Sequence, residues 1–241
     1  AAAAGARVAK HGGRSVSSKS GSADVLEGLG VSLNQTPQQV AQSIHEIGVG
    51  FMFAPNYHAA MKHAAPVRRE LGIKTLFNIL GPLTNPANAK RQVLGVFNED
   101  LVTTLAHVLQ LLGSEHVLIV HGKDGLDEIT ITGETNVGEL RNGTVAVHTI
   151  RPEDFNLKTS PIETIRVTDN EHAKTMLLSV LENVAGPARD VVLMNAGAAI
   201  YVSGIADTLE QGIKTAHQAI ESGAALKKLQ ELVEFTHRNS V

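Results

Sequence analysis

The chain has 241 residues, a hydrophobic fraction of 43% and a formal net charge of −3, which allow one large α/β domain with or without a smaller appendage. The near-neutral charge argues against a general nucleic-acid or membrane binder. The absence of cysteine excludes a disulfide scaffold, a thiol nucleophile and a zinc–thiolate site. No apolar run approaches the roughly 20 residues that span a bilayer, and the first residues lack the pattern of a signal peptide. We therefore expect a cytoplasmic protein.

The segment from Lys10 to Asp24 is rich in glycine, hydroxyl groups and cations, and it runs into an apolar sequence typical of a helix. Small residues let a ligand approach the backbone, and the free N–H groups at a helix start attract anions. Lysine and arginine add positive charge, and serine hydroxyl groups donate hydrogen bonds to phosphate oxygens. The segment predicts a phosphate-binding loop. The alternative is a flexible Ser/Gly linker, against which the interleaved cations argue.

The first predicted elements are short. A strand over 7–9 leads into the glycine-rich segment. A helix over 23–29 ends at Gly30, since glycine is typical of helix C-termini. A second helix begins at 36–37, with threonine as its cap and proline in its first turn. Residues 51–54 are either a buried strand or a turn between helices.

The middle of the chain predicts a basic helix followed by a hinge. The helix covers 57–71, and Pro66 should kink or divide it. Two prolines and a glycine among large apolar residues make 77–86 a rigid, partly buried loop and a hinge.

Strands and helices alternate in the second half. The predicted strands cover 92–97, 117–120, 129–132 and 145–150. The predicted helices cover 100–112, 171–185, 190–202, 208–222 and 224–237. This alternation predicts an α/β domain with a largely parallel central sheet flanked by helices.

Asp127 and Glu128 form a carboxylate pair in a polar, Gly-containing turn that follows the predicted strand over 117–120. Ligands of such sheets gather beyond the carboxyl ends of the strands, so the pair and the glycine-rich segment can share one edge. Mg²⁺ prefers one or two carboxylates together with substrate oxygens. The pair therefore indicates a magnesium site, and the alternative is a solvated turn.

Other candidate side chains are weaker signals. Arg68, beside Arg69, could clamp a carboxylate or phosphate by bidentate hydrogen bonding, but it could equally be a solvent-facing charge on a basic helix. His58 and His63 have a poor spacing for joint metal ligation on one helix face, so we predict no zinc site. No nucleophile elbow and no P-loop motif is present, which argues against a serine hydrolase and a P-loop nucleotidase.

Several of these motifs resemble the signatures of the anthranilate phosphoribosyltransferase family, which has the nucleoside phosphorylase type II fold. The matching segments are 10–14, 17–18, 21–24, 26–27, 53–55 with His58, 67–69, 77–86 and 125–128. They occur in the expected order, and the resemblance extends through the C-terminal helices to cover nearly all of the chain.

The resemblance implies transfer of a phosphoribosyl group from phosphoribosyl pyrophosphate (PRPP) to the amine of anthranilate, with release of pyrophosphate. It places Gly13 and Arg68 against anthranilate, and it assigns Mg²⁺ to Asp127 and Glu128. No protein nucleophile is expected. The residues that it assigns to PRPP are Lys10, His11, Gly12, Gly13, Arg14, Ser15, Val16, Ser17, Ser18 and Ser22.

The resemblance also implies a division of the chain and two departures from the family. An α/β catalytic domain would cover 1–54 and 83–241, and a remnant of the small helical domain with its hinge would cover 55–82. Gly13 stands where the family usually has Asn. The family's upstream Gly-Thr-Gly-Gly-Asp and Asn-x-Ser-Thr motifs, and the N-terminal helices that build its homodimer, are absent. We therefore expect a chain that lacks the family's N-terminal segment and has weak or no activity.

Two other functions stay open. One is a pyrimidine nucleoside phosphorylase of the same fold, although the phosphate-binding motif of such enzymes differs from 10–14. The other is a non-catalytic relative that binds nucleic acid or a protein, against which the near-neutral charge and the intact Asp127-Glu128 pair argue.

Overall fold

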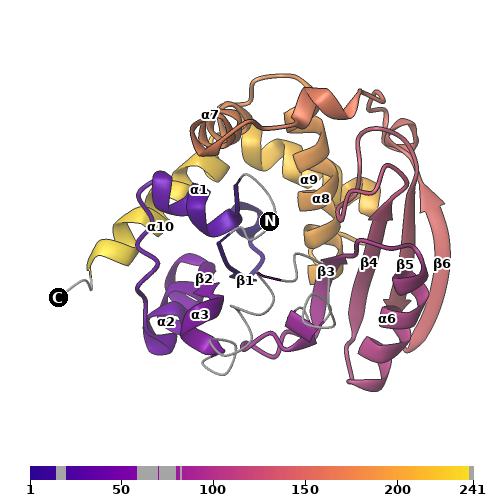
Figure 1. The fold of residues 1–241 in the computed structure, drawn as a ribbon, viewed down its shortest axis with the longest axis horizontal. Coiled ribbons are helices and arrows are strands. Elements are labelled where there is room, and N and C mark those ends of the chain that lie inside the picture. The colour runs from indigo at the N-terminus through magenta and orange to yellow at the C-terminus, as the bar shows by residue number, and fades with distance from the viewer. Residues whose placement is uncertain (15–19, 59–69, 71–79, 82, 239–241) are drawn as a thin grey trace.

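The computed structural model describes residues 1–14, 20–58, 70, 80–81 and 83–238 (Figure 1). The strands are β1 (Val8–Gly12), β2 (Val49–Phe53), β3 (Arg91–Gly95), β4 (His116–Gly122), β5 (Thr135–Arg141) and β6 (Thr144–Ile150). The α-helices are α1 (Ser22–Gly28), α2 (Pro37–Ile47), α3 (Ala54–Tyr57), α6 (Asp100–Leu111), α7 (Asn170–Leu181), α8 (Pro187–Ser203), α9 (Leu209–Glu221) and α10 (Ala224–Arg238). Short 3₁₀ helices are η1 (Ala2–Ala4), η2 (Pro152–Phe155) and η3 (Ile162–Ile165).

The strands form two sheets. β1 pairs with β2 in parallel, and the second sheet has the order β3-β4-β5-β6. Figure 1 shows this second sheet on one side of the molecule, the first sheet with α1, α2 and α3 on the other, and α8 and α9 between them. The predicted α/β class is therefore confirmed.

The second sheet is mixed rather than largely parallel. β3 and β4 are parallel, whereas the pairs β4-β5 and β5-β6 are antiparallel. A two-residue connection accounts for the antiparallel pairing of β5 with β6. Asn142 and Gly143 both have positive φ angles, 52° and 74°, as the tight turn of an Asn-Gly hairpin requires. The sequence analysis missed β5, and this Asn-Gly pair was the available signal.

The predicted strand over 129–132 is wrong. Ile129 and Ile131 are fully buried, as in a strand, but the segment pairs with no neighbouring strand among the described residues. Side chains instead form hydrogen bonds with the backbone N–H and C=O groups of this segment. The Ile129 N–H donates to Oδ1 of Asn195, the Asn195 amide donates back to the Ile129 carbonyl, and the Thr130 N–H donates to Oγ1 of Thr135. Buried polar backbone needs partners, and here α8 and the start of β5 provide them.

Most other predicted elements are confirmed, with shifted ends. The strand over 7–9 extends to Gly12, and residues 51–54 belong mainly to a strand, β2. Thr36 caps α2: its hydroxyl accepts from the Gln39 N–H, and the Gln39 side chain accepts from the Thr36 N–H. Most of the predicted helix over 57–71 lies outside the residues that the structure describes, as do residues 77–79 and 82 of the predicted loop over 77–86. The rest of that segment is described, and residues 80–81 and 83 are helical rather than loop.

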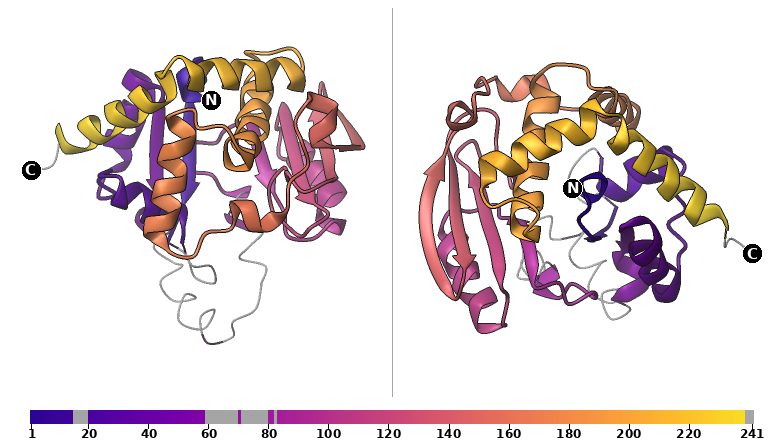
Figure 2. Two further views of the ribbon diagram at one scale, coloured as in Figure 1. Left: turned by 90° about the horizontal axis from the view of Figure 1, so that it is seen from above. Right: turned by 180° about the vertical axis from the view of Figure 1, so that it is seen from behind.

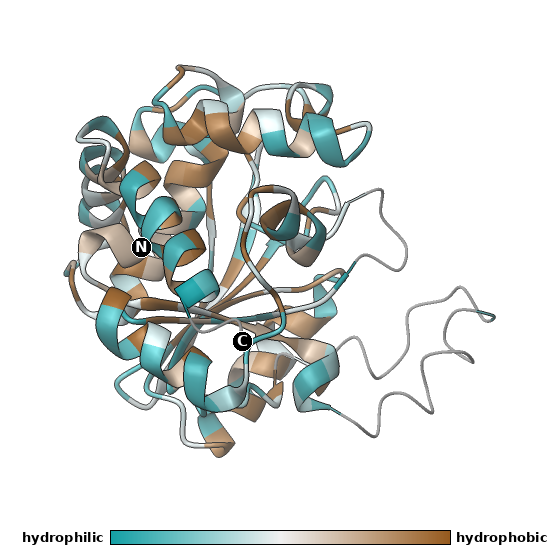
Figure 3. Cartoon of the chain, turned by 90° about the vertical axis from the view of Figure 1, so that its left-hand side faces the viewer, coloured by the Kyte–Doolittle hydropathy of each residue, from teal (hydrophilic) through white to brown (hydrophobic). Residues whose placement is uncertain are grey.

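The core lies on both faces of the second sheet. Val117, Ile119 and Leu140 face α6, whereas Leu118 and Val120 face α8, in the alternation that a strand imposes. Figure 2 shows the helices around the strands from two further sides, and Figure 3 shows hydrophobic residues on the inner strands. The helices that are described are not of a length and hydropathy that would cross a bilayer.

One close backbone approach positions the loop after β4. β3 ends at Gly95, and a Cβ atom placed there would lie 1.6 Å from the carbonyl oxygen of Asp127. Only glycine leaves room for this contact. It holds Asp127 at the carboxyl end of β3.

We expect Gly95→Ala to lower the free energy of unfolding by about 1–3 kcal/mol, because the backbone of Asp127 has to move away. Urea unfolding followed by circular dichroism measures the change. Gly133→Ala is the matched control, since a Cβ there meets nothing within 4 Å. Equal stabilities of the two variants would contradict this account of the loop.

Candidate functional site

The end of β1 and the start of α1 form one wall of the candidate site. Lys10, His11 and Gly12 are the last residues of β1. A Cβ on Gly12 would lie 2.9 Å from the Ser22 hydroxyl oxygen and 3.3 Å from the Phe51 ring. This packing requires glycine, and it brings the first residue of α1 against the end of the strand. Of the residues predicted to bind PRPP, Ser15, Val16, Ser17 and Ser18 lie outside the described residues, as does Arg68.

Arg14 is held by two carboxylates. Its Nη1 and Nη2 atoms lie 2.7 and 2.9 Å from the two carboxylate oxygens of Glu27, and Nη1 lies 3.0 Å from Asp24. The guanidinium also lies 5.7 Å from the centre of the Phe53 ring. These hydrogen bonds raise the pKa of Arg14 and lower the pKa of Glu27. Arg14 thus connects the end of β1 to α1, a partnership that the sequence analysis did not predict.

His11 contacts His58. Their Nε2 atoms are 3.2 Å apart, and the rings meet edge to face with centroids 4.9 Å apart. One nitrogen has to donate and the other to accept, so this contact exists only while at least one ring is neutral. Burial lowers the pKa of His11, and the nearby charges of His58 and Lys10 lower it further. The sequence analysis compared His58 only with His63. The parallel pairing of β1 with β2, which is not readable from local sequence, creates this pair.

Asp127 and Glu128 lie beyond β4, at the edge where β3 ends. Glu128 also lines an apolar cavity of about 670 Å³ between α7, α8 and α10. Burial raises the pKa of Glu128 above its usual range, the positive charge of Lys10 opposes this rise, and the negative charge of Asp127 adds to it. Lys10, at the end of β1, is therefore near enough to Glu128 for its charge to act on that carboxylate.

Asp124 shapes the loop that carries this pair. Its carboxylate accepts hydrogen bonds from the hydroxyl groups of Thr130 and Thr132, at 2.7 Å each, and from the Leu126 N–H at 3.0 Å. Although burial opposes the effect, these hydrogen bonds lower the pKa of Asp124. Asp124 is therefore a structural anion, and the sequence analysis did not single it out.

The donor set is suited to a hard cation that shares its ligands with a substrate. Within the described ranges, no three His, Asp or Glu side chains form a complete metal site. Two adjacent carboxylates without a third protein ligand are what Mg²⁺ uses when phosphate oxygens complete its coordination. The predicted magnesium residues thus fit this ion.

Comparisons with known proteins agree with each other. Residues 1–226 match the model of the glycosyl transferase family, a/b domain. The chain is 68% identical to the anthranilate phosphoribosyltransferase of Nitrosospira multiformis, covering 100% of this chain and 70% of that protein. It is 63% identical to the enzyme of the same name from Nitrosomonas eutropha, covering 99% and 70%.

Solved structures of the same family superpose on this chain. The anthranilate phosphoribosyltransferase of Thermus thermophilus superposes with a TM-score of 0.91 at 42% identity, covering 98% of this chain and 70% of that one. The enzyme from Saccharomyces cerevisiae in complex with PRPP and Mg superposes with a TM-score of 0.87 at 28% identity, covering 98% and 68%.

Proposed function

Because this chain belongs to the anthranilate phosphoribosyltransferases, which transfer the phosphoribosyl group of PRPP to anthranilate in tryptophan biosynthesis, we propose that its substrates meet between β1 and the Asp127-Glu128 loop. The family, the fold class and the reaction predicted from the sequence are confirmed. The observation that carries the proposed site is its geometry: Lys10 lies at the carboxyl end of β1, and the backbone of Asp127 packs against Gly95 at the carboxyl end of β3.

PRPP binding is assigned to the end of β1 and the start of α1. Lys10 supplies positive charge, His11 a ring nitrogen, Gly12 and Gly13 accessible backbone, and Ser22 a hydroxyl group at the start of a helix. Each of these groups suits phosphate oxygens. Ser15, Val16, Ser17 and Ser18 complete the predicted set and stay predictions.

The chemistry requires stabilisation of charge rather than a protein nucleophile. As pyrophosphate departs, the ribose C1 atom gains oxocarbenium character and negative charge grows on the leaving group. The ammonium group of Lys10 stabilises that charge. Asp127 and Glu128 would hold Mg²⁺, which when bound neutralises the leaving pyrophosphate. The S. cerevisiae relatives bind Mg, and one binds PRPP as well, which supports this assignment.

Anthranilate is assigned to Gly13 and Arg68, where Arg68 would face its carboxylate. Among the described residues, a Cβ on Gly13 would meet only Ala54, at 3.9 Å. A relative from S. cerevisiae was solved with 4-fluoroanthranilate, which supports an aromatic acid as the second substrate.

The domain division is also proposed. The α/β catalytic domain covers 1–54 and 83–241, and the small helical part covers 55–82. The first boundary falls inside α3, directly after β2. A homodimer, a cytoplasmic location and the absence of nucleic-acid binding stay predictions.

The activity of this chain is measured by the loss of anthranilate fluorescence on addition of PRPP and Mg²⁺. We expect weak or no turnover, because the Gly-Thr-Gly-Gly-Asp and Asn-x-Ser-Thr motifs of the family are not in the sequence. Turnover at the rate of the N. multiformis relative, assayed beside it, would contradict this expectation.

The magnesium assignment predicts that Asp127→Asn and Glu128→Gln each weaken the Mg²⁺-dependent binding of PRPP by about tenfold or more, because each removes a ligand charge. Isothermal titration calorimetry with and without EDTA measures the effect. Glu163→Gln, at an exposed residue of η3, is the matched control. If the control and the two site variants bind PRPP equally well, the metal lies elsewhere.

Arg14 differs from the other PRPP residues because carboxylates already neutralise it, so we assign it to orienting the loop that follows. Arg14→Gln and Glu27→Gln should then each weaken PRPP binding about two- to fivefold, the size of a partly exposed ion pair. Because both substitutions break the same ion pair, the double variant should bind PRPP no more weakly than either single variant.

If Arg14 instead contacts a phosphate of PRPP directly, the Glu27→Gln variant should change PRPP affinity in the opposite direction. Glu27→Gln would then strengthen PRPP binding, because it removes a carboxylate that competes for the guanidinium. Arg238→Gln, which breaks another exposed ion pair, is the control for a general change of surface charge. Calorimetric titration of all four proteins with PRPP decides between the two roles.

A further inference from the structure

A second cavity, of about 250 Å³, lies at the opposite end of the parallel strands. It is beside the first residues of β4 and the last residues of β5, whereas Asp127 and Glu128 follow the carboxyl end of β4. None of the residues that line it belongs to the proposed active site. The proposed function therefore leaves this cavity unexplained.

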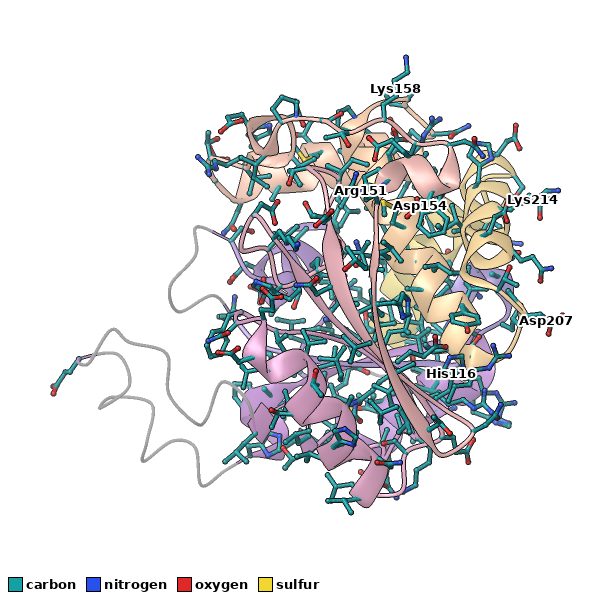
Figure 4. All side chains as sticks on the ribbon, turned by 90° about the vertical axis from the view of Figure 1, so that its right-hand side faces the viewer. His116, Arg151, Asp154, Lys158, Asp207 and Lys214 are labelled. Atoms are coloured by element: carbon teal, nitrogen blue, oxygen red, sulfur yellow. The ribbon has the colours of Figure 1, made fainter. Side chains whose placement is uncertain are left out.

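One face of the sheet forms the floor of the cavity. Leu118 pairs with Glu139 across β4 and β5, and Val137 pairs with His148 across β5 and β6. Because side chains alternate along a strand, these residues share the face that α8 covers near its C-terminal end. The walls are formed by Tyr201 of α8, Phe155 of η2 and residues 207–209, where α9 begins. Figure 4 labels His116, which contacts Glu139, and Asp207, which is one of the lining residues.

Glu139 offers a carboxylate oxygen to this cavity. Its Oε1 atom accepts hydrogen bonds from the Tyr201 hydroxyl at 2.6 Å and from Nε2 of His116 at 3.0 Å. In the part of the chain that is described, no donor reaches its Oε2 atom. The hydrogen bond from His116 lowers the pKa of Glu139, burial opposes it, and the bond from Tyr201 lowers it further. Glu139 is therefore an anion with one oxygen available.

Arg141 offers a fixed cation beside it. Its Nη1 atom donates to the Tyr201 hydroxyl at 2.9 Å, and the guanidinium lies 5.3 Å from the centre of the Tyr201 ring. No carboxylate pairs with Arg141 among the described residues, so Nη2 and Nε remain free to donate. Burial, together with the hydrogen bond to Glu139, raises the pKa of Tyr201 to about 12, so its hydroxyl keeps its proton and holds the two charges in place.

The remaining lining is mostly apolar. Five side chains extend the cavity away from the charged pair: Leu118, Val137, Ile150, Phe155 and Leu209. Cavities for drug-sized ligands measure about 300–1,000 Å³, so this one is limited to a small molecule. Besides Tyr201, the polar lining residues are Glu139, Arg141, His148, Asp207 and Thr208, so the cavity offers both a carboxylate and a guanidinium. A small zwitterion with an apolar body satisfies both charges.

We propose that this cavity binds a free α-amino acid with an apolar side chain. Its ammonium group lies on Glu139, its carboxylate lies on Arg141, and its side chain contacts the apolar residues of the floor and walls. Glu139 and Arg141 lie at the opposite end of the strands from the proposed active site. The amino acid would therefore bind in addition to PRPP and anthranilate.

Calorimetric titration of the chain with L-leucine tests the proposal. L-leucine is aliphatic and so differs from the aromatic substrate of the proposed active site. We expect saturable binding with a Kd of about 1 mM or lower. Isocaproate, which lacks the ammonium group, and isoamylamine, which lacks the carboxylate, should each bind at least about tenfold more weakly. Absence of saturable L-leucine binding, or equal binding of either analogue, would overturn it.

Substitutions locate the binding. Glu139→Gln and Arg141→Gln should each weaken L-leucine binding by about tenfold or more, because each removes one charge-assisted contact. Lys214→Gln, on the same side of the molecule but outside the cavity (Figure 4), should leave it unchanged. Far-ultraviolet circular dichroism and PRPP titration confirm that the variants are folded. Folded Glu139 and Arg141 variants that bind L-leucine as well as the original chain would refute the assignment.

Discussion

The site depends on the contact between Gly95 and the backbone of Asp127, which leaves no room for a side chain. This contact carries the loop after β4 across the carboxyl end of β3, and Asp124 closes the loop through two threonine hydroxyl groups. Asn195 of α8 then fixes the Ile129 backbone on the far side. The backbone of the Asp127-Glu128 pair is therefore supported on both sides.

Charge in the proposed site suits a highly anionic substrate that brings its own cation. Asp127 adds to the negative charge at Glu128, and Lys10 is a nearby cation. Arg14, in contrast, is satisfied by Asp24 and Glu27. In the proposed site, a polyphosphate that brings a divalent cation would add the positive charge that the carboxylates lack, while its own oxygens would meet Lys10 and the helix start at Ser22. Substrate and metal would then stabilise one another's binding.

The sequence allowed the helices, the fold class and the family to be predicted, because caps such as Thr36-Pro37 and the motif at 10–14 are local signals. It did not allow the wrongly predicted strand over 129–132 to be excluded, because Ile129 and Ile131 alternate with polar residues just as strand residues do. The backbone of Ile129 forms its hydrogen bonds with Asn195, which is distant in sequence, instead of with a neighbouring strand. The contact of His11 with His58 depends on the pairing of β1 with β2, which no local pattern reports. The Asn142-Gly143 hairpin was readable and was missed.

Helix α8 connects the two ends of the second sheet. Asn195 holds Ile129, the residue after Glu128, and six residues further along Tyr201 orders Glu139 and Arg141. Six residues of an α-helix span about 9 Å, and the buried residues between them, among them Ala198 and Ile200, fix the helix against the sheet. A displacement of α8 along its axis would therefore alter both charged clusters at once. The packing that fixes Glu139 and Arg141 at one end of the strands also fixes the backbone next to Glu128 at the other.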